Sequence, residues 1–374
     1  MSTAELDSLE TLMGQSNADV DELVHHVRDN ADVIFTWNYD QGERASLSKL
    51  YEKAKGAQWN GATDLPWETD VDQEFFAHSL AQMDAAEREA KGIDLTGTVF
   101  ERWGDREWEA QAFEVQNWTM SQFLHGEQGA LVCSAKIVET VPWVDAKYYA
   151  STQVMDEARH VEVFARYLDE KMAGHYPVNR HLRELLDDII ADSRWDMTYL
   201  GMQIMIEGLA LASFGMAHAV TPDPLLRQLL RYVMSDEARH VAFGVLSLAE
   251  YYQELTEAEM FERQQFAFEA AVRMRDRFMA QEMWERLGVP PRDAAKIFAE
   301  TPEQKNADPF QQLLFSKIVP NCKKLGLLDA NNGWLRERFD TLGVSQFEDW
   351  ADTSTDYEVL DEVSKDRAEG AAAT

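Results

Sequence analysis

The chain has 374 residues, 45% of them hydrophobic, so it is long enough to bury a substantial core. It carries 67 acidic and 35 basic residues, a formal net charge of −32, so we expect neither nucleic acid nor an anionic membrane as its main partner. The two cysteines, Cys133 and Cys322, have no metal or redox spacing, and the acidic N-terminus lacks the pattern of a signal peptide. We therefore expect a soluble, cytoplasmic protein.

Apolar residues recur at helical spacing along almost the whole chain, which predicts an all-α protein. Residues 1–104 read as an N-terminal helical extension with a loop rich in tryptophan, aspartate and glycine. The spacing then predicts four long amphipathic helices, at about 108–140, 143–173, 180–220 and 223–253. Short links between consecutive long helices favour antiparallel packing, so we expect a four-helix bundle over 105–255.

The rest of the chain reads as helices that pack on this bundle, followed by a polar tail. A helix predicted over 256–287 begins with a capping box, in which Thr256 is the N-cap and Glu259 reaches back to it. We place C-terminal helices at 256–346 and an acidic tail without chemistry at 347–374.

One phrase of the sequence occurs twice. The letters DEARHVEVF begin at position 156, and DEARHVAFG begins at position 236, eighty residues later. The same offset relates Glu127 to Glu207 and Pro142 to Pro222. A fixed offset between matching residues indicates that a helical hairpin has been duplicated within the chain.

Each proline lies midway between two glutamates. Pro142 is fifteen residues from Glu127 and from Glu157, and the second hairpin repeats this spacing with Glu207 and Glu237. Because proline disrupts a helix interior, it marks the turn between two helices. Fifteen residues at about 1.5 Å each bring both carboxylates of a hairpin to one level, about 22 Å from the turn. Four glutamates on four helices are therefore predicted at one depth.

Each Glu-x-x-His phrase adds a histidine one turn from its glutamate, on the same helix face. The surrounding residues are apolar, and four buried carboxylates at one level would repel one another strongly. Two divalent cations would remove this penalty, and oxygen and imidazole donors without thiolate suit iron or manganese better than zinc. The predicted metal ligands, which are also the predicted catalytic residues, are Glu127, Glu157, His160, Glu207, Glu237 and His240.

An alternative explanation of the repeated phrase is a pair of buried Glu–Arg ion pairs, since Arg159 and Arg239 lie two residues after Glu157 and Glu237. Ion pairs alone do not explain the two histidines or the upstream glutamates. The complete set of six residues therefore favours a dinuclear metal site.

This ligand pattern resembles that of the ferritin-like carboxylate-bridged di-iron proteins, in which two helices each supply a Glu and two others each supply Glu-x-x-His. The resemblance covers 105–255 and implies a ferritin-like four-helix bundle with extra N- and C-terminal helices. The DEARH wording is similar to that of bacterial monooxygenase hydroxylases and related di-iron oxygenases. It implies that Asp156 and Asp236 each hold the metal-bound histidine of the opposite hairpin, with Arg159 and Arg239 as their charge partners.

Departures from the family pattern separate its subclasses. Radical-bearing ribonucleotide reductase subunits place a tyrosine four residues after the first metal histidine, where this chain has Phe164. Di-iron arylamine N-oxygenases carry an extra histidine ligand four residues before the last Glu-x-x-His, where this chain has Val233, so we do not expect that subclass. Iron-storage ferritins are much shorter, and acyl-carrier-protein desaturases act on an acidic carrier that a charge of −32 would repel. An oxygenase or oxidase fits best.

We therefore predict an O2-activating non-haem di-iron oxygenase that hydroxylates a small hydrophobic or aromatic substrate. Two Fe ions, or an Mn/Fe pair, would be the cofactor, and a separate reductase would supply electrons, because no flavin, nicotinamide or iron–sulfur motif occurs. Alternatives are a ferroxidase or Mn/Fe oxidase without hydroxylation, and a bundle that keeps only a structural metal pair. The oligomeric state stays open, with a homodimer as one option.

Residues predicted to line the substrate pocket are Phe123, Ala130, Phe164, Gln203, Ala210, Leu211 and Phe214, and the small residues Gly126, Gly129 and Gly208 are predicted to leave it room.

Overall fold

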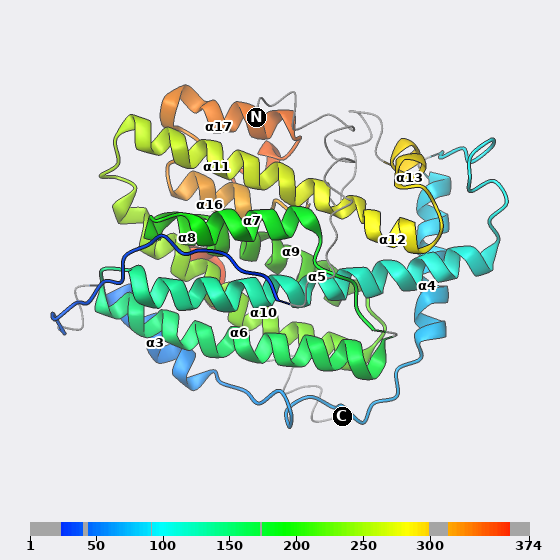
Figure 1. Cartoon of the computed structure of the whole chain (residues 1–374), viewed down its shortest axis with the longest axis horizontal. Helices are drawn as coiled ribbons and strands as arrows, with labels where there is room; N and C mark the ends of the chain where they lie inside the picture. Colours follow the sequence, from blue (N-terminus) through cyan, green and yellow to red (C-terminus); the bar gives the residue numbers. More distant parts are fainter. Residues whose placement is uncertain (1–23, 40–43, 91, 173, 299–312, 360–374) are drawn as a thin grey trace.

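The computed structural model describes residues 24–39, 44–90, 92–172, 174–298 and 313–359. Every regular element within these ranges is a helix, which confirms the predicted all-α class. The long helices run roughly parallel or antiparallel to one another across the view of Figure 1, and α4 (Gln73–Ala90) stands crosswise at one end of them.

Two helical hairpins form the centre of the molecule. The first consists of α5 (Asp105–Thr140) and α6 (Val144–Lys171), and Pro142 lies in the short turn between them. The second consists of a composite helix over Trp195–Val220 and α10 (Pro224–Tyr251), with Pro222 in its turn. The two prolines therefore mark the hairpin turns, as the sequence predicted. Asp223 caps α10, because its carboxylate accepts a hydrogen bond from the backbone N–H of Leu225 at 2.8 Å.

The third predicted helix, 180–220, is not continuous. It consists of α7 (Arg180–Ala191), a break at 192–194, then α8 (Trp195–Tyr199), the π-helix η1 (Leu200–Ile206) and α9 (Glu207–Val220). The buried Lys136 ammonium explains the break, because it donates to the carbonyls of Ile190 and Asp192, each at 2.6 Å, and so caps the end of α7. The π-helix ends directly before Glu207, and such segments often occur at functional sites.

The predicted helix over 256–287 is also shorter than expected. The capping box forms as predicted, with Thr256 and Glu259 exchanging hydrogen bonds at 2.8 and 3.3 Å. The helix α11 (Glu257–Asp276) passes into the short 3-10 helix η2 (Arg277–Met279), and α12 (Gln281–Arg286) follows. Ala280, between the last two, has a φ of 46° in the left-handed region, which stops the preceding helix.

The flanking helices cover the bundle on several sides. An apolar cluster that includes Ala81, Phe100, Trp108 and Trp284 joins α4, α5 and α12 at one end of the bundle. On the opposite side of the molecule, α17 (Ala330–Thr341) packs along α11 (Figure 1). The other flanking elements are α3 (Ala45–Gly56), α13 (Pro291–Phe298), α16 (Ile318–Lys324) and the 3-10 helix η3 (Ser345–Phe347).

The first part of the predicted acidic tail packs on the rest of the protein. Thr353 is fully buried, its backbone N–H donates to the Asn321 side chain at 2.8 Å, and Tyr357 is also buried. Residues 347–359 therefore pack against the C-terminal helices, whereas 360–374, like 1–23 of the N-terminal extension, lie outside the described residues.

Within the part of the chain that the structure describes, one helix, Trp195–Val220, is long and apolar enough to cross a membrane, with a mean hydropathy of 1.4 over its most apolar window. Other helices bury 72% of that window. Its apolar surface is therefore explained by its position inside the bundle, where it supplies one of the glutamates described below.

Candidate metal centre

The two hairpins bring all six predicted ligands together in the middle of the bundle. Glu127 comes from α5, the first Glu-x-x-His pair from α6, Glu207 from the start of α9, and the second pair from α10. None of the six is more than 4% exposed to solvent. Their donor atoms form two overlapping groups, each with all atoms within 4.8 Å of one another: Glu127, Glu157, His160 and Glu237 in one, and Glu157, Glu207, Glu237 and His240 in the other.

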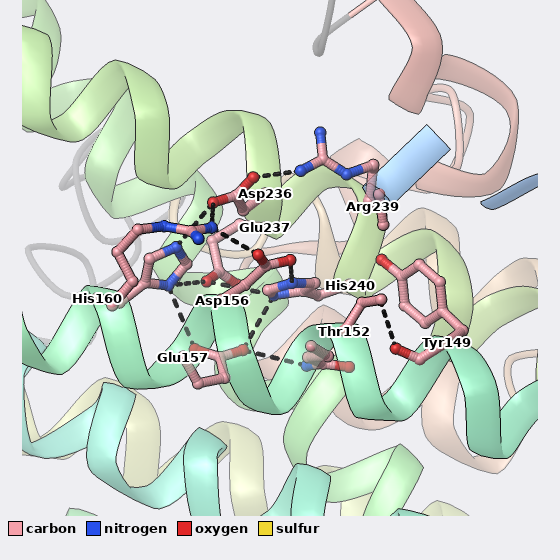
Figure 2. Close-up of polar contacts among 12 residues, drawn as sticks. Tyr149, Thr152, Asp156, Glu157, His160, Asp236, Glu237, Arg239 and His240 are labelled. Atoms are coloured by element: carbon pink, nitrogen blue, oxygen red, sulfur yellow. Dashed lines mark hydrogen bonds and ion pairs between the residues drawn. The ribbon is translucent and has the colours of Figure 1, made fainter. Parts of the chain in front are cut away.

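Both histidines turn the same ring nitrogen toward the carboxylates. His160 Nδ1 lies 3.2 Å from Glu127 Oε2 and 3.2 Å from Glu157 Oε2. His240 Nδ1 lies 3.0 Å from Glu157 Oε1, so the Glu157 carboxylate reaches both rings, as Figure 2 shows. Glu237 Oε1 lies 3.3 Å from His160 Nδ1 and 3.5 Å from His240 Nδ1. Glu157 and Glu237 therefore stand between the two halves of the site.

The protonation of the cluster follows from its burial. Burial and the nearby Glu237 carboxylate raise the pKa of Glu127 and of Glu207 well above the usual range. Burial would also raise the pKa of Glu157, but the two adjacent histidine rings outweigh it and hold the value low. Burial opposes charge on both histidines, yet the facing carboxylates raise the pKa of His160 and His240. The cluster thus holds protons in positions that a metal ion could take.

The outer nitrogens of the two histidines are held across the hairpins. His160 Nε2 lies 3.2 Å from Asp236 Oδ2, and His240 Nε2 lies 3.3 Å from Asp156 Oδ2. Arg159 donates to Asp236 at 3.0 Å and also bonds Asp156. This is the crossed arrangement that the family resemblance implied for the two aspartates. It leaves each Nδ1 free to face the centre.

Asp236 has one further partner that the sequence did not indicate. The indole N–H of Trp59 donates to Asp236 Oδ2 at 2.8 Å, and the ring stacks on Tyr232 at a centroid distance of 4.8 Å. Trp59 and Trp67 are both buried, whereas Trp37 is 75% exposed. The sequence shows that this loop contains tryptophan, but no spacing rule connects the loop to Asp236, so the contact could not be predicted.

Two buried amides also approach the glutamates. Gln153 Nε2 donates to Glu207 Oε1 at 2.8 Å and to Glu157 Oε1 at 3.1 Å. Gln203 Nε2 in turn donates to Gln153 Oε1 at 3.5 Å. Gln203 was predicted to line the pocket, but it supports Gln153 instead.

A small cavity of about 20 Å³ lies on the other side of the glutamates. Four of the predicted pocket residues line it, whereas Leu211 and Phe164 do not. Phe164 packs against Phe123 and Phe214, with ring centroids 5.9 Å from each. Sequence reasoning missed Gln122, Ile206 and Arg277. The complete lining is Gln122, Phe123, Gly126, Glu127, Ala130, Ile206, Glu207, Ala210, Phe214, Glu237 and Arg277.

The predicted role of the small residues is correct for only one of the three glycines. Gly126 lines the cavity, with nothing within 4 Å of where its Cβ would be. A Cβ on Gly129 would come within 2.4 Å of Leu186, and one on Gly208 would contact Ile318 at 3.4 Å. These two glycines therefore make room for neighbouring helices. His125, next to Gly126 in the chain, belongs to neither donor group, and its Nε2 contacts the Tyr176 carbonyl at 2.8 Å.

The donor set fits two divalent cations. Both carboxylate oxygens of Glu237 and Glu207 Oε2 accept no hydrogen bond although they are buried, which would be costly without a further ligand. The four carboxylates and two imidazoles form two donor groups that share Glu157 and Glu237. Together they can coordinate two such ions and neutralise their charge.

Comparisons with known proteins give one family match. The model of the family described as P-aminobenzoate N-oxygenase AurF matches residues 135–326. No curated protein matches the chain.

Solved structures with a related fold include R2-like ligand-binding oxidases. One with an aerobically reconstituted metal cofactor after photoconversion has 18% sequence identity and a TM-score of 0.48, covering 77% of this chain and 99% of that chain. Another, with an aerobically reconstituted Mn/Fe cofactor, has 17% identity and a TM-score of 0.47, covering 77% and 98%. At this level of similarity neither structure bears on what the chain does.

The family match corrects one prediction. We did not expect an N-oxygenase family, because Val233 occupies the position of the extra histidine ligand. Val233 is fully buried among apolar side chains, so this chain offers no donor there. The absence of this one ligand therefore does not separate the chain from the family that its other residues match.

Proposed function

Because this chain belongs to the AurF family, described as P-aminobenzoate N-oxygenase, it is an oxidoreductase, and we propose that it is an O2-activating di-iron oxygenase. The proposed ligands are Glu127, Glu157, His160, Glu207, Glu237 and His240. The observation that carries the proposal is the convergence of these six buried side chains into two overlapping donor groups.

The protein residues around the ligands would fix their geometry. Each aspartate accepts the outer N–H of a histidine, which selects the tautomer with Nδ1 available for a metal and increases its basicity. Gln153 holds one oxygen of Glu207 and leaves the other without a partner. The ligands therefore need little reorganisation to bind a metal.

Two iron ions, or an Mn/Fe pair, would supply the activation of O2. The chain itself limits the entry of water, because the cavity beside the glutamates has room for no more than about one water-sized molecule and is walled by Phe123 and Phe214. Exclusion of water protects a strong oxidant from side reactions.

We propose a small hydrophobic or aromatic substrate on the cavity side. Phe123 and Phe214 contact each other edge to face, with ring centroids 4.6 Å apart, and two alanines complete an apolar wall. The family description adds oxygenation of an aromatic amine nitrogen to the reactions to be tested alongside hydroxylation. Electrons would come from a separate reductase in the cytoplasm, and we propose neither a nucleic acid nor a membrane as partner.

The proposal is tested by measuring metal content and O2 consumption on the same preparation. Protein from iron-replete cells should contain two iron or manganese ions per chain by mass spectrometry. After anaerobic reduction, O2 uptake should depend on the added organic substrate, with aniline and toluene as first probes. Rapid oxidation of free Fe(II) that no organic substrate changes would instead support the ferroxidase alternative. Protein without bound metal would refute the oxygenase.

A further inference from the structure

The guanidinium of Arg277 lines the cavity beside the glutamates, and among the described residues it has no anionic partner. The side chain is only 4% exposed, and Nε makes no hydrogen bond. Nη1 makes a weak contact with the sulfur of Met274, at 3.8 Å, and the guanidinium carbon lies 5.1 Å from the centre of the Phe278 ring. Burial lowers the pKa of Arg277 to about 10, so the group still carries its charge at neutral pH.

Each of the other lysine and arginine side chains that are buried in the described part of the chain has an oxygen partner. These side chains are Lys136, Arg159, Arg239 and Arg263. Arg263, for example, forms two hydrogen bonds with Asp196, at 2.9 and 3.1 Å. A buried charge without a partner is strongly unfavourable, so Arg277 departs from the pattern of this protein.

The cavity that this guanidinium lines has space for one small guest. Its volume of about 20 Å³ is close to what one water-sized molecule requires, and most of its wall is apolar. Gln122 also lines it, but both ends of that amide are already used. Nε2 donates to the Pro177 carbonyl at 2.9 Å, and Oε1 accepts from the Asn179 N–H at 2.7 Å. Arg277 therefore supplies the donors that remain for a guest.

Metal binding would leave Arg277 as the unbalanced charge. The four glutamates carry four negative charges, and two divalent cations cancel them. Asp156 and Asp236 are balanced by Arg159 and Arg239. The positive charge of Arg277 then faces the cavity with nothing among the described residues to neutralise it.

We propose that this cavity binds one small monovalent inorganic anion, with chloride as the physiological example, through the guanidinium of Arg277. A chloride ion accepts N–H groups from any direction, so the fixed fork of the guanidinium can hold it. The apolar wall keeps water from competing, which strengthens the ion pair. The inference rests on the proposed function, because the glutamates that share the cavity would repel an anion until metal ions neutralise them.

A bound anion would stand between the glutamates and any molecule that enters from the cavity side. Glu127, Glu207 and Glu237 all line the same cavity as Arg277. An entering substrate would therefore have to displace the anion. The ion would balance the charge of the site while no substrate is bound, and chloride and substrate should compete for the same space.

The first test measures the midpoint of thermal unfolding of metal-loaded protein while chloride replaces gluconate at constant ionic strength. An anion that binds only the folded protein raises this midpoint, and gluconate is too large for the cavity. Raising chloride about 100-fold should raise the wild-type midpoint by about 2–4 °C. Arg277→Met should show no such rise, and Arg277→Lys should keep part of it.

Arg273→Met is the matched control. It removes a positive charge one turn earlier, whose partners are Asp188 and Glu269 on the surface side. Because Arg273 does not line the cavity, this variant should keep the full rise with chloride.

The second test locates the ion in crystals of metal-loaded protein soaked in bromide, whose anomalous scattering distinguishes it from water. Wild-type crystals should show bromide within hydrogen-bond distance of the Arg277 guanidinium, and Arg277→Met crystals should show none there. Bromide found only at the protein surface would overturn the inference, and so would an equal chloride effect in wild type and Arg277→Met.

The gluconate series separates anion binding from a structural role. Removing an unpaired buried charge should leave the midpoint of Arg277→Met in gluconate unchanged or higher than that of wild type. A lower midpoint would show that Arg277 supports the fold through a partner of its own and would count against the anion site. Metal content of the same samples reports separately on the proposed function: metal-loaded protein without the chloride effect defeats only the anion site.

Discussion

The two hairpins supply the same proposed ligands but build different surroundings for them. Residues eighty positions apart occupy equivalent places, and the ligand glutamates and histidines obey this symmetry. The neighbours do not. Phe123 of the first hairpin corresponds to Gln203 of the second, and Phe164 corresponds to Gly244. The cavity therefore lies beside the aromatic ring of Phe123, whereas the equivalent position of the second hairpin holds the amide of Gln203.

The polar side is closed by tight packing. A Cβ on Gly244 would approach the Cβ of Gln203 to 2.5 Å, so the absence of a side chain at Gly244 is what admits Gln203. Gln203 in turn supports Gln153, whose amide donates to two glutamates. Gln153 itself corresponds to Val233, which is packed among apolar residues. The two hairpins thus keep the same pattern of glutamates and histidines, while the residues beside it pack tightly around Gln203 and leave a cavity beside Phe123.

The largest effect is expected where the two halves meet. Glu157 belongs to both donor groups, so Glu157→Ala should remove most bound metal and abolish O2 uptake. Metal affinity should fall by more than the 10- to 100-fold (about 1–3 kcal/mol) that is typical when a residue hydrogen-bonded to a metal ligand is replaced. His240→Ala removes a ligand of one group only and should leave about half the metal while O2 uptake is lost. Mass spectrometry and an oxygen electrode measure both. Normal metal content in both variants would rule out the assigned ligands.

The convergence of the six proposed ligands could be predicted from sequence because it depends on counting residues alone. An offset of eighty and a spacing of thirty around a proline place four glutamates at one level, whatever the details of packing. The partners of these ligands depend on contacts between distant segments, such as Trp59 with Asp236, 177 residues apart. Arg277 lies outside the repeat, on an element where a helix was expected to continue. The π-helix before Glu207 was missed for a similar reason, since helical periodicity does not distinguish it from an α-helix.

The amide side can be converted into its apolar counterpart with Gln153→Val, which places valine at both equivalent positions. Glu207 and Glu157 would each lose a hydrogen bond. Metal affinity, measured by competition with a chelator, should fall about 10- to 100-fold. Thr152→Val is the control, because Thr152 bonds only the Tyr149 carbonyl and should not alter affinity. An unchanged affinity in Gln153→Val would mean that the amide does not position the ligands.

The close packing at Gly244 gives a prediction for stability. Gly244→Ala should destabilise the fold by about 1–3 kcal/mol, because the new methyl group meets the start of the Gln203 side chain and not its flexible end. Gly126→Ala is the matched control on the open side, where nothing lies within 4 Å, and helix propensity favours alanine by about 1 kcal/mol. Urea unfolding of the metal-free proteins measures both. Equal stability of the two variants would show that the polar side is not closed as described.

The smallest effect is expected at Trp59, which donates to Asp236 and lies beside the His160 ring, with centroids 6.4 Å apart, but belongs to neither donor group. Trp59→Phe keeps a ring to stack on Tyr232 and under Arg159, whose Cζ lies 4.6 Å from the indole, but it removes the N–H donor to Asp236. Asp236 retains both arginines and His160, so losing one of several hydrogen bonds should cost about 0.5–1.5 kcal/mol. Metal dissociation should accelerate only a few-fold. Trp59→Ala also removes the stacking and leaves a gap, so its unfolding midpoint should fall further. If the two variants release metal at the same rate, the indole acts through its hydrogen bond to Asp236. If only the alanine variant releases metal faster than wild type, the ring acts through packing. Asp236 then does not need the indole donor to hold His160.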